Sequence, residues 1–146
     1  MRKPNTNVLI EAVGVLRSRL EIAFAPDTAA DGFKGSAAST GHCAAVAAIV
    51  YEILGGDMIS TKTGRQSHWL NRLHDHERSV DVDLTGDQFG LPPIQITKAG
   101  ELYAETRLRF SSELSPETLV RARLLAERAG LTAAVRAIND RLKSRR

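Results

Sequence analysis

Residues 42–54, His-Cys-Ala-Ala-Val-Ala-Ala-Ile-Val-Tyr-Glu-Ile-Leu, restrict the possible folds of this chain more than any other segment. The segment is apolar on almost every side, and it ends at Gly55-Gly56, a usual signal for the end of a helix. A helix without a polar face belongs at the centre of a fold rather than at its surface. We therefore expect a helix from about His42 to Leu54 that the rest of the chain encloses.

The segments around this helix predict an α+β fold, with helices first, a small antiparallel sheet next and helices last. Apolar residues recur at helical spacing in 6–20, whereas 25–41 has the composition of a loop. We expect short strands at 58–63, 66–73, 78–84 and 102–109, and an ordered loop at 85–97. Ser115 and Thr132 are expected to cap two C-terminal helices, which end near Gly130 and Lys143.

The charge of the chain is divided unevenly along its length. Residues 1–118 contain 12 Lys and Arg against 15 Asp and Glu, whereas residues 119–146 contain 8 against 2. The net charge of +3 therefore comes from the C-terminal segment. Binding of nucleic acid across the whole surface is not supported, and no aromatic residue follows Phe110 to stack on bases.

The only cysteine, Cys43, lies at the start of the apolar helix, directly after the loop sequence Ser-Thr-Gly-His. With Thr40 as the helix cap, Cys43 falls in the first turn, where backbone N–H groups lack helical acceptors. The helix dipole favours a thiolate there, and the free N–H groups can hold a developing oxyanion. This position suits a nucleophile, although a free cysteine is also common as a small buried apolar residue.

A base for this nucleophile is predicted on the hairpin that follows. If Asp75 and His76 are the central turn residues, His68 lies directly opposite Asp83 on one face of the sheet. A carboxylate in that position can orient the imidazole toward Cys43, which gives a Cys-His-Asp triad. Asp81 faces the same side and replaces Asp83 if the register shifts by two residues.

The order of these residues resembles that of papain-like and transglutaminase-like cysteine enzymes, with the nucleophile on a central helix and His and Asp on adjacent strands. More closely, the chain resembles the bacterial YunG family. The shared motifs are Pro26-Asp27-Thr28-Ala29, Gly41-x-Cys43-Ala44, Gly55-Gly56, Ser67-His68-x-x-Asn71 and Asp83-Leu84-Thr85-x-x-Gln88-Phe89.

The resemblance implies a papain-like or transglutaminase-like core, in which the helix that starts at the cysteine packs on a small antiparallel sheet. It spans 8–90 well, and it supplies no substrate. His42 stands where glutamine is expected before the cysteine, and it is a possible supporting residue. Gln88 is another, because its amide can donate to a substrate carbonyl or to the loop backbone.

Two domain segments follow: a Cys-His-Asp catalytic core over 1–112, and a basic helical extension over 113–146 packed on the same domain. The expected function is that of a cysteine hydrolase or acyl-transfer enzyme of amidase, peptidase or deamidase type. It would act on a protein, a peptide or a small amide without a cofactor. The absence of a signal peptide or membrane span, together with the single cysteine, favours a cytoplasmic protein.

Two alternatives remain open at this stage. Cys43, His68, His74 and His76 are acceptable zinc ligands, but their spacing matches no common zinc motif. The second alternative is a non-catalytic binding module whose basic C-terminal helix contacts nucleic acid or an acidic protein. Apolar residues at helical spacing in that segment, from Leu124 to Leu142, instead favour amphipathic helices whose arginines face solvent.

Overall fold

The structure is a computed structural model that describes residues 6–30, 39, 41–63, 66–74 and 78–145. It confirms the α+β class. The helices are α1 (Thr6–Ala23), α2 (Cys43–Leu54), α3 (Pro116–Arg128) and α4 (Thr132–Lys143), and the strands are β1 (Asp57–Thr63), β2 (Gln66–His74), β3 (Ser79–Asp83), β4 (Gln95–Lys98) and β5 (Arg107–Arg109). Three short 3₁₀ helices, η1 (Pro26–Thr28), η2 (Gly86–Phe89) and η3 (Ser111–Glu113), lie in the connections.

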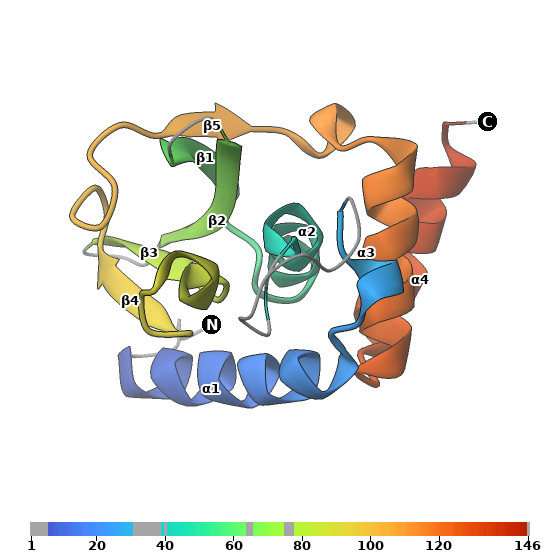
Figure 1. The fold of residues 1–146 in the computed structure, drawn as a ribbon, viewed down its shortest axis with the longest axis horizontal. Helices are drawn as coiled ribbons and strands as arrows, with labels where there is room; N and C mark the ends of the chain where they lie inside the picture. The colour runs from blue at the N-terminus through green and yellow to red at the C-terminus, as the bar shows by residue number, and fades with distance from the viewer. Residues whose placement is uncertain (1–5, 31–38, 40, 64–65, 75–77, 146) are drawn as a thin grey trace.

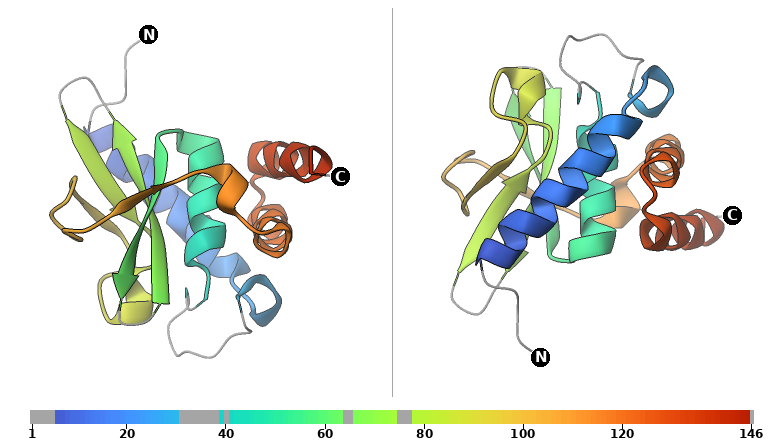
Figure 2. Two further views of the ribbon diagram at one scale, coloured as in Figure 1. Left: turned by 90° about the horizontal axis from the view of Figure 1, so that it is seen from above. Right: turned by 90° about the horizontal axis from the view of Figure 1, so that it is seen from below.

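Helix α2 occupies the centre of the molecule, as its apolar sequence predicts. It lies between the sheet on one side and the α3–α4 pair on the other, while α1 runs along the edge of both layers (Figures 1 and 2). Residues 45–50 of α2 are all buried. Burial on every side explains why this helix needs no polar face.

The sheet has five antiparallel strands in the order β4-β3-β2-β1-β5. On β2, Asn71 and Leu73 face α2, because the Asn71 amide donates to the carbonyl of Ala47 at 2.9 Å and Leu73 belongs to the main apolar core. Side chains alternate along a strand, so His68 and Leu70 belong to the opposite face. Both are nevertheless buried, and the sheet is therefore covered on both sides.

The predicted register of the β2–β3 hairpin is wrong by two residues. Arg72 pairs with Asp81 and Asn71 pairs with Val82, so His68 does not lie directly opposite Asp83. A shift by an even number of residues keeps every side chain on its predicted face. The expected turn residues, Asp75 and His76, lie outside the described residues.

Other differences from the sequence prediction concern short elements and caps. Strand β4 overlaps the end of the stretch 85–97 that is expected as loop, and it pairs with β3 through Val82↔Ile96. Thr132 is the first residue of α4, and Leu131 occupies the cap position. Ser115 caps α3 as predicted, because its hydroxyl accepts from the Thr118 N–H at 3.1 Å. None of the helices described here is long and apolar enough to cross a membrane.

Several C-terminal arginines bind to groups on other parts of the chain. Arg128 contacts Asp27 through two hydrogen bonds of 2.6 and 2.7 Å, and Arg141 pairs with Glu52 of α2. Arg145 donates to the carbonyl oxygens of Leu114 and Ser111. These contacts attach the α3–α4 pair to the rest of the molecule.

Two isoleucines of α2 test its central position. Ile49 is fully buried, whereas Ile53 on the same helix is 39% exposed. We expect Ile49→Ala to lower the free energy of unfolding by about 2–5 kcal/mol, because it leaves a cavity between sheet and helices. Ile53→Ala should cost less than about 1 kcal/mol. Urea unfolding of both variants provides the measurement, and equal losses would contradict the assigned position of α2.

Candidate functional site

A fully buried histidine and a fully buried aspartate are hydrogen-bonded to each other at the C-terminal end of β3. The Nε2 atom of His68 lies 2.7 Å from Oδ2 of Asp83, and neither side chain is exposed. The contact runs diagonally across the two strands, because the register differs from the expected one by two residues. The structure therefore brings together the pair that the sequence predicted, although by a different strand pairing.

Asp83 receives hydrogen bonds from four donors, which together satisfy a carboxylate that is removed from water. Besides His68, the Tyr103 hydroxyl donates to Oδ2 at 3.2 Å. The backbone N–H and hydroxyl of Thr85 donate to Oδ1 at 2.9 and 3.3 Å. Buried charges are tolerated when they are paired and hydrogen-bonded in this way. Burial and the charge of Asp83 both raise the pKa of Tyr103, so its hydroxyl keeps the proton that it donates.

The imidazole of His68 is enclosed by aromatic rings. Phe89 of η2 makes an edge contact with a centroid separation of 4.7 Å, and Tyr103 makes another at 5.5 Å. Burial alone would lower the pKa of His68, but hydrogen bonding to Asp83 and the proximity of Asp83 and Cys43 raise it to about 9. His68 is accordingly an imidazolium at neutral pH.

Cys43 is half-buried and is the first residue of α2, with His42 in the cap position. This differs from the expectation that Thr40 caps the helix; Thr40 itself lies outside the described residues. The thiol is 3.9 Å from the carbonyl oxygen of Ser67, the residue that precedes His68. Cys43 also lies close enough to His68 to contribute to the raised pKa of its imidazole.

The second ring nitrogen of His68 has no hydrogen-bond partner in the described part of the chain, although it is buried. This atom, Nδ1, is available because Nε2 is held by Asp83. Strand β3 pairs with β2 only over Asn71–His74, so His68 lies beyond the paired region, where the start of α2 can approach. A cysteine and an unpaired imidazole nitrogen thus lie together at the end of a helix.

The loop before Cys43 is held by η2. Asp87 accepts from the Ser39 N–H at 3.4 Å and from the Ser39 hydroxyl, and it forms an ion pair of 3.0 Å with the buried Arg17 of α1. The Ser39 hydroxyl also reaches the carbonyl of Thr85 at 3.3 Å. The segment after Asp83 therefore fixes both the carboxylate and the approach to the cysteine.

The three supporting residues suggested by the sequence have other contacts. Asp81 binds Arg72 through two hydrogen bonds of 2.7 and 3.0 Å and accepts from the Gly100 N–H. It does not replace Asp83 beside His68. The Gln88 amide donates to the carbonyl of Thr85 at 3.0 Å, and Nε2 of His42 lies 2.7 Å from the Thr28 hydroxyl. These contacts are structural: Asp81 and Gln88 accept from or donate to backbone groups, and His42 contacts the hydroxyl of Thr28.

The remaining candidate metal ligands do not join this site. His74 lies at the other end of β2, where it contacts Ser79 at 2.6 Å and Asp57 at 2.7 Å. His76 lies outside the described residues. Over the described ranges, no three His, Cys, Asp or Glu side chains are placed to hold a metal ion.

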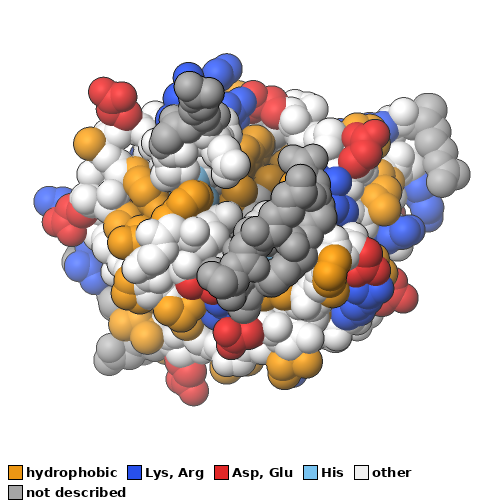
Figure 3. All heavy atoms as spheres, in the orientation of Figure 1, with side chains coloured by type: hydrophobic (Ala, Val, Ile, Leu, Met, Phe, Trp, Pro, Cys, Tyr) orange, Lys and Arg blue, Asp and Glu red, His pale blue; other side chains and the backbone are white. Residues whose placement is uncertain are grey.

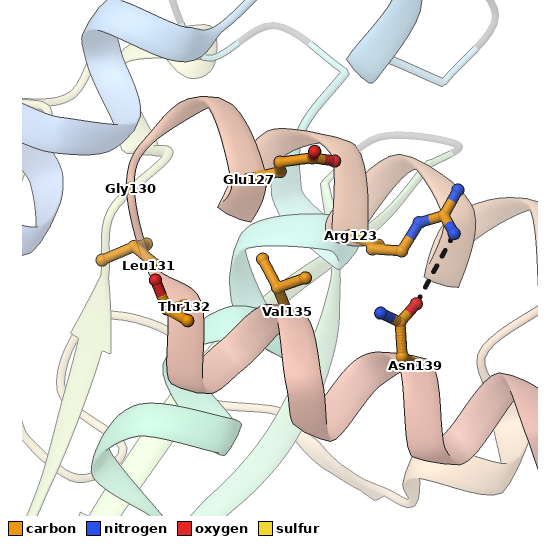
Figure 4. Close-up of a pocket in the computed structure, with 7 residues that line it drawn as sticks. All are labelled: Arg123, Glu127, Gly130, Leu131, Thr132, Val135 and Asn139. Atoms are coloured by element: carbon orange, nitrogen blue, oxygen red, sulfur yellow. Dashed lines mark hydrogen bonds between the residues drawn. The ribbon is translucent and has the colours of Figure 1, made fainter.

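A separate cavity of about 380 Å³ lies between α3 and α4, on the side of α2 away from the sheet (Figure 4). Arg123 donates there to the Asn139 side chain at 3.5 Å, as the figure shows. No cysteine or histidine lines this cavity. It is therefore distinct from the Cys43–His68–Asp83 cluster.

Tyr103, Phe89 and Asp87 also contribute to the site, and none of them is predicted as a site residue from the sequence. Phe89 belongs to a motif that the chain shares with the YunG family, but the motif does not predict that its ring contacts His68. Tyr103 is twenty residues from Asp83, in the stretch 102–109 that the sequence predicts as a strand and of which only Arg107–Arg109 is one. Hydrogen bonds of the 99–106 segment to Asp81, Arg72 and Thr61 hold Tyr103 in this position.

The fold and this cluster define an α+β protein with a helix-start cysteine beside a buried His-Asp pair. The model of the family described as YunG protein matches residues 13–128, and the chain belongs to that family. Neither a curated protein nor a solved structure matches the chain.

The ionisation of His68 can be followed by NMR of its ring nitrogens. We expect a midpoint of about 9. Asp83→Asn should lower the midpoint clearly, because burial is then opposed only by the nearby Cys43. Asp57→Asn, at the exposed His74 pair, is the matched control and should leave His68 unchanged.

The same shift determines how stability depends on pH. Because the folded pKa of His68 exceeds the unfolded value of about 6.5, its contribution is fully present below pH 6.5 and is lost as pH rises through about 9. Asp83→Asn should remove that part of the pH dependence. A wild-type midpoint near 6.5 would contradict the assigned pairing.

Proposed function

We propose that this protein is a cysteine hydrolase or acyl-transfer enzyme in which Cys43, His68 and Asp83 act as a triad. The observation that carries the proposal is the buried His68, whose Nε2 is held by Asp83 while Nδ1 remains unpaired near Cys43. A nucleophile, a base and a group that orients the base are the parts this chemistry needs. The same order of residues in papain-like and transglutaminase-like enzymes supports the proposal.

In the first half of the reaction, the Cys43 sulfur attacks the carbonyl carbon of an amide, ester or thioester. The protonated His68 stabilises the negative charge on the sulfur before attack. As the C–S bond forms, the bond to the leaving group breaks, and His68 transfers its Nδ1 proton to that group. Backbone N–H groups in the first turn of α2 are suited to stabilise the oxyanion.

In the second half, His68 takes a proton from water or from another acceptor. The activated oxygen or nitrogen attacks the acyl carbon, the C–S bond breaks, and the thiolate is restored. Asp83 keeps Nε2–H of His68 oriented throughout and stabilises the imidazolium. The reaction uses only groups of this chain, and a protein, a peptide or a small amide would serve as substrate.

The alternative, a non-catalytic binding module, relies on the basic C-terminal segment. Three of its arginines, Arg128, Arg141 and Arg145, already form hydrogen bonds within the chain. Fewer cations are therefore available to bind a nucleic acid or an acidic partner. If the protein were such a binding module, Cys43→Ala would not change its function, whereas charge reversal at Lys143 and its neighbours would remove it.

A general acyl donor, p-nitrophenyl acetate, tests the proposal without knowledge of the natural substrate. We expect an initial burst of p-nitrophenolate, with an acetyl group on Cys43 by mass spectrometry. Cys43→Ala and His68→Ala should each abolish the burst, whereas Asp83→Ala should retain a measurable fraction of the rate, because the imidazole still samples the productive orientation.

The exposed His74–Asp57 pair on the same sheet provides the control for this experiment. His74→Ala and Asp57→Ala should leave the burst unchanged. Melting temperatures must accompany the rates, because loss of Asp83 removes a hydrogen-bond partner from buried His68. A folded Cys43→Ala variant that still becomes acetylated as fast as the wild type would overturn the proposal.

A further inference from the structure

We propose that a groove beside Cys43 binds an anionic group of the substrate, a carboxylate or a phosphate. This inference rests on the proposed function and adds a substrate class to it. The groove has a volume of about 450 Å³ and runs along the edge of the sheet formed by β1 and β5. Its lining includes Lys62, Arg107 and Arg109.

The groove and the thiol have a common neighbour in Ser67. Ser67 lines the groove, and the carbonyl oxygen of the same residue is 3.9 Å from Sγ of Cys43. Lys62 is the cross-strand partner of Ser67, and Arg107 is the partner of Ser60 on the other side of β1. Alternation along the strands places these residues on the sheet face that carries α2, the helix that begins at Cys43.

The charge of the groove favours an anion. Three cationic side chains line it against a single carboxylate, that of Glu105. Arg109 is already held by Glu113 and the Ser60 hydroxyl, whereas Lys62 and Arg107 are exposed. Figure 3 shows Lys and Arg side chains gathered at this edge of the molecule, above the ends of β1 and β5.

The chemistry of the lining suits oxygen anions. Ammonium and guanidinium groups form charge-assisted hydrogen bonds with carboxylates and phosphates, and the serine hydroxyls of the groove add neutral donors. Binding of a charged group at Lys62 and Arg107 would fix the substrate while its carbonyl carbon lies at Cys43. Such remote binding contributes to catalysis by orienting the reacting atoms.

Trp69 lies beside this groove and contacts residues that line it. It is the only tryptophan of the chain, it pairs with Ser60 across the strands, and Arg109 lies over its ring at 5.3 Å. We would titrate the Cys43→Ala variant with three tripeptides that are acetylated at the N-terminus and amidated at the C-terminus, made of glutamate, of glutamine, or of glutamine with a central phosphoserine. The glutamate or the phosphoserine peptide should produce a saturable change in fluorescence, and the glutamine peptide should produce none.

Charge reversal at Lys62→Glu or Arg107→Glu should weaken that binding about tenfold or more, as expected for loss of about 1.4 kcal/mol or more from a charge-assisted contact. High salt should weaken it as well. Lys143→Glu, at an exposed position on α4, is the matched control and should have no effect. Equal responses to the glutamate and glutamine peptides, or no response to either anionic peptide, would overturn the proposal.

A second measurement connects the groove to the thiol. Cys43 is alkylated with iodoacetate, which is an anion, and with iodoacetamide, which is neutral. The ratio of the two rates is compared between the wild type and variants that retain Cys43. Lys62→Glu and Arg107→Glu should lower the iodoacetate rate relative to the iodoacetamide rate. If Cys43 is reactive but neither substitution changes the ratio of the two rates, the groove proposal is wrong and the proposed function still stands. If Cys43 reacts no faster than glutathione with either reagent, the result contradicts the proposed function.

Discussion

The buried carboxylate of Asp83 is the constraint on which the arrangement around the cysteine depends. Its two oxygens accept from His68, Tyr103 and Thr85, which belong to β2, to the 99–106 segment and to the turn before η2. A charge that is fully removed from water must keep these donors, so the three segments are held in one arrangement. The position of the imidazole, and with it the unpaired Nδ1, follows from that requirement.

The central helix could be predicted from sequence because its signal is local. An apolar surface on every side, and a Gly-Gly end, require only the residues of the helix itself. The alternation of β2 and β3 placed His68 and Asp83 on the same face for the same reason. Their exact pairing depends on the turn, and an assumed two-residue turn led to a register that is wrong by two.

The contacts that complete the site join residues distant in the chain, and no local pattern encodes them. Tyr103 reaches Asp83 because Asp81 and Arg72 hold the segment that carries it. Asp87 holds the loop before Cys43 from a position 48 residues away from Ser39. The roles expected of Gln88 and His42 were assigned by proximity in sequence, whereas their side chains bind backbone and hydroxyl groups nearby.

The most direct test of the account is whether His68 governs the reactivity of Cys43. The rate at which Cys43 reacts with 4,4′-dithiodipyridine at neutral pH would be measured in the wild type and in His68→Gln, with glutathione as reference. If the imidazolium stabilises the negative charge on the sulfur, the wild type reacts faster than glutathione and the substitution removes this excess. Equal rates in the two folded proteins would contradict the claim that Cys43, His68 and Asp83 form one site.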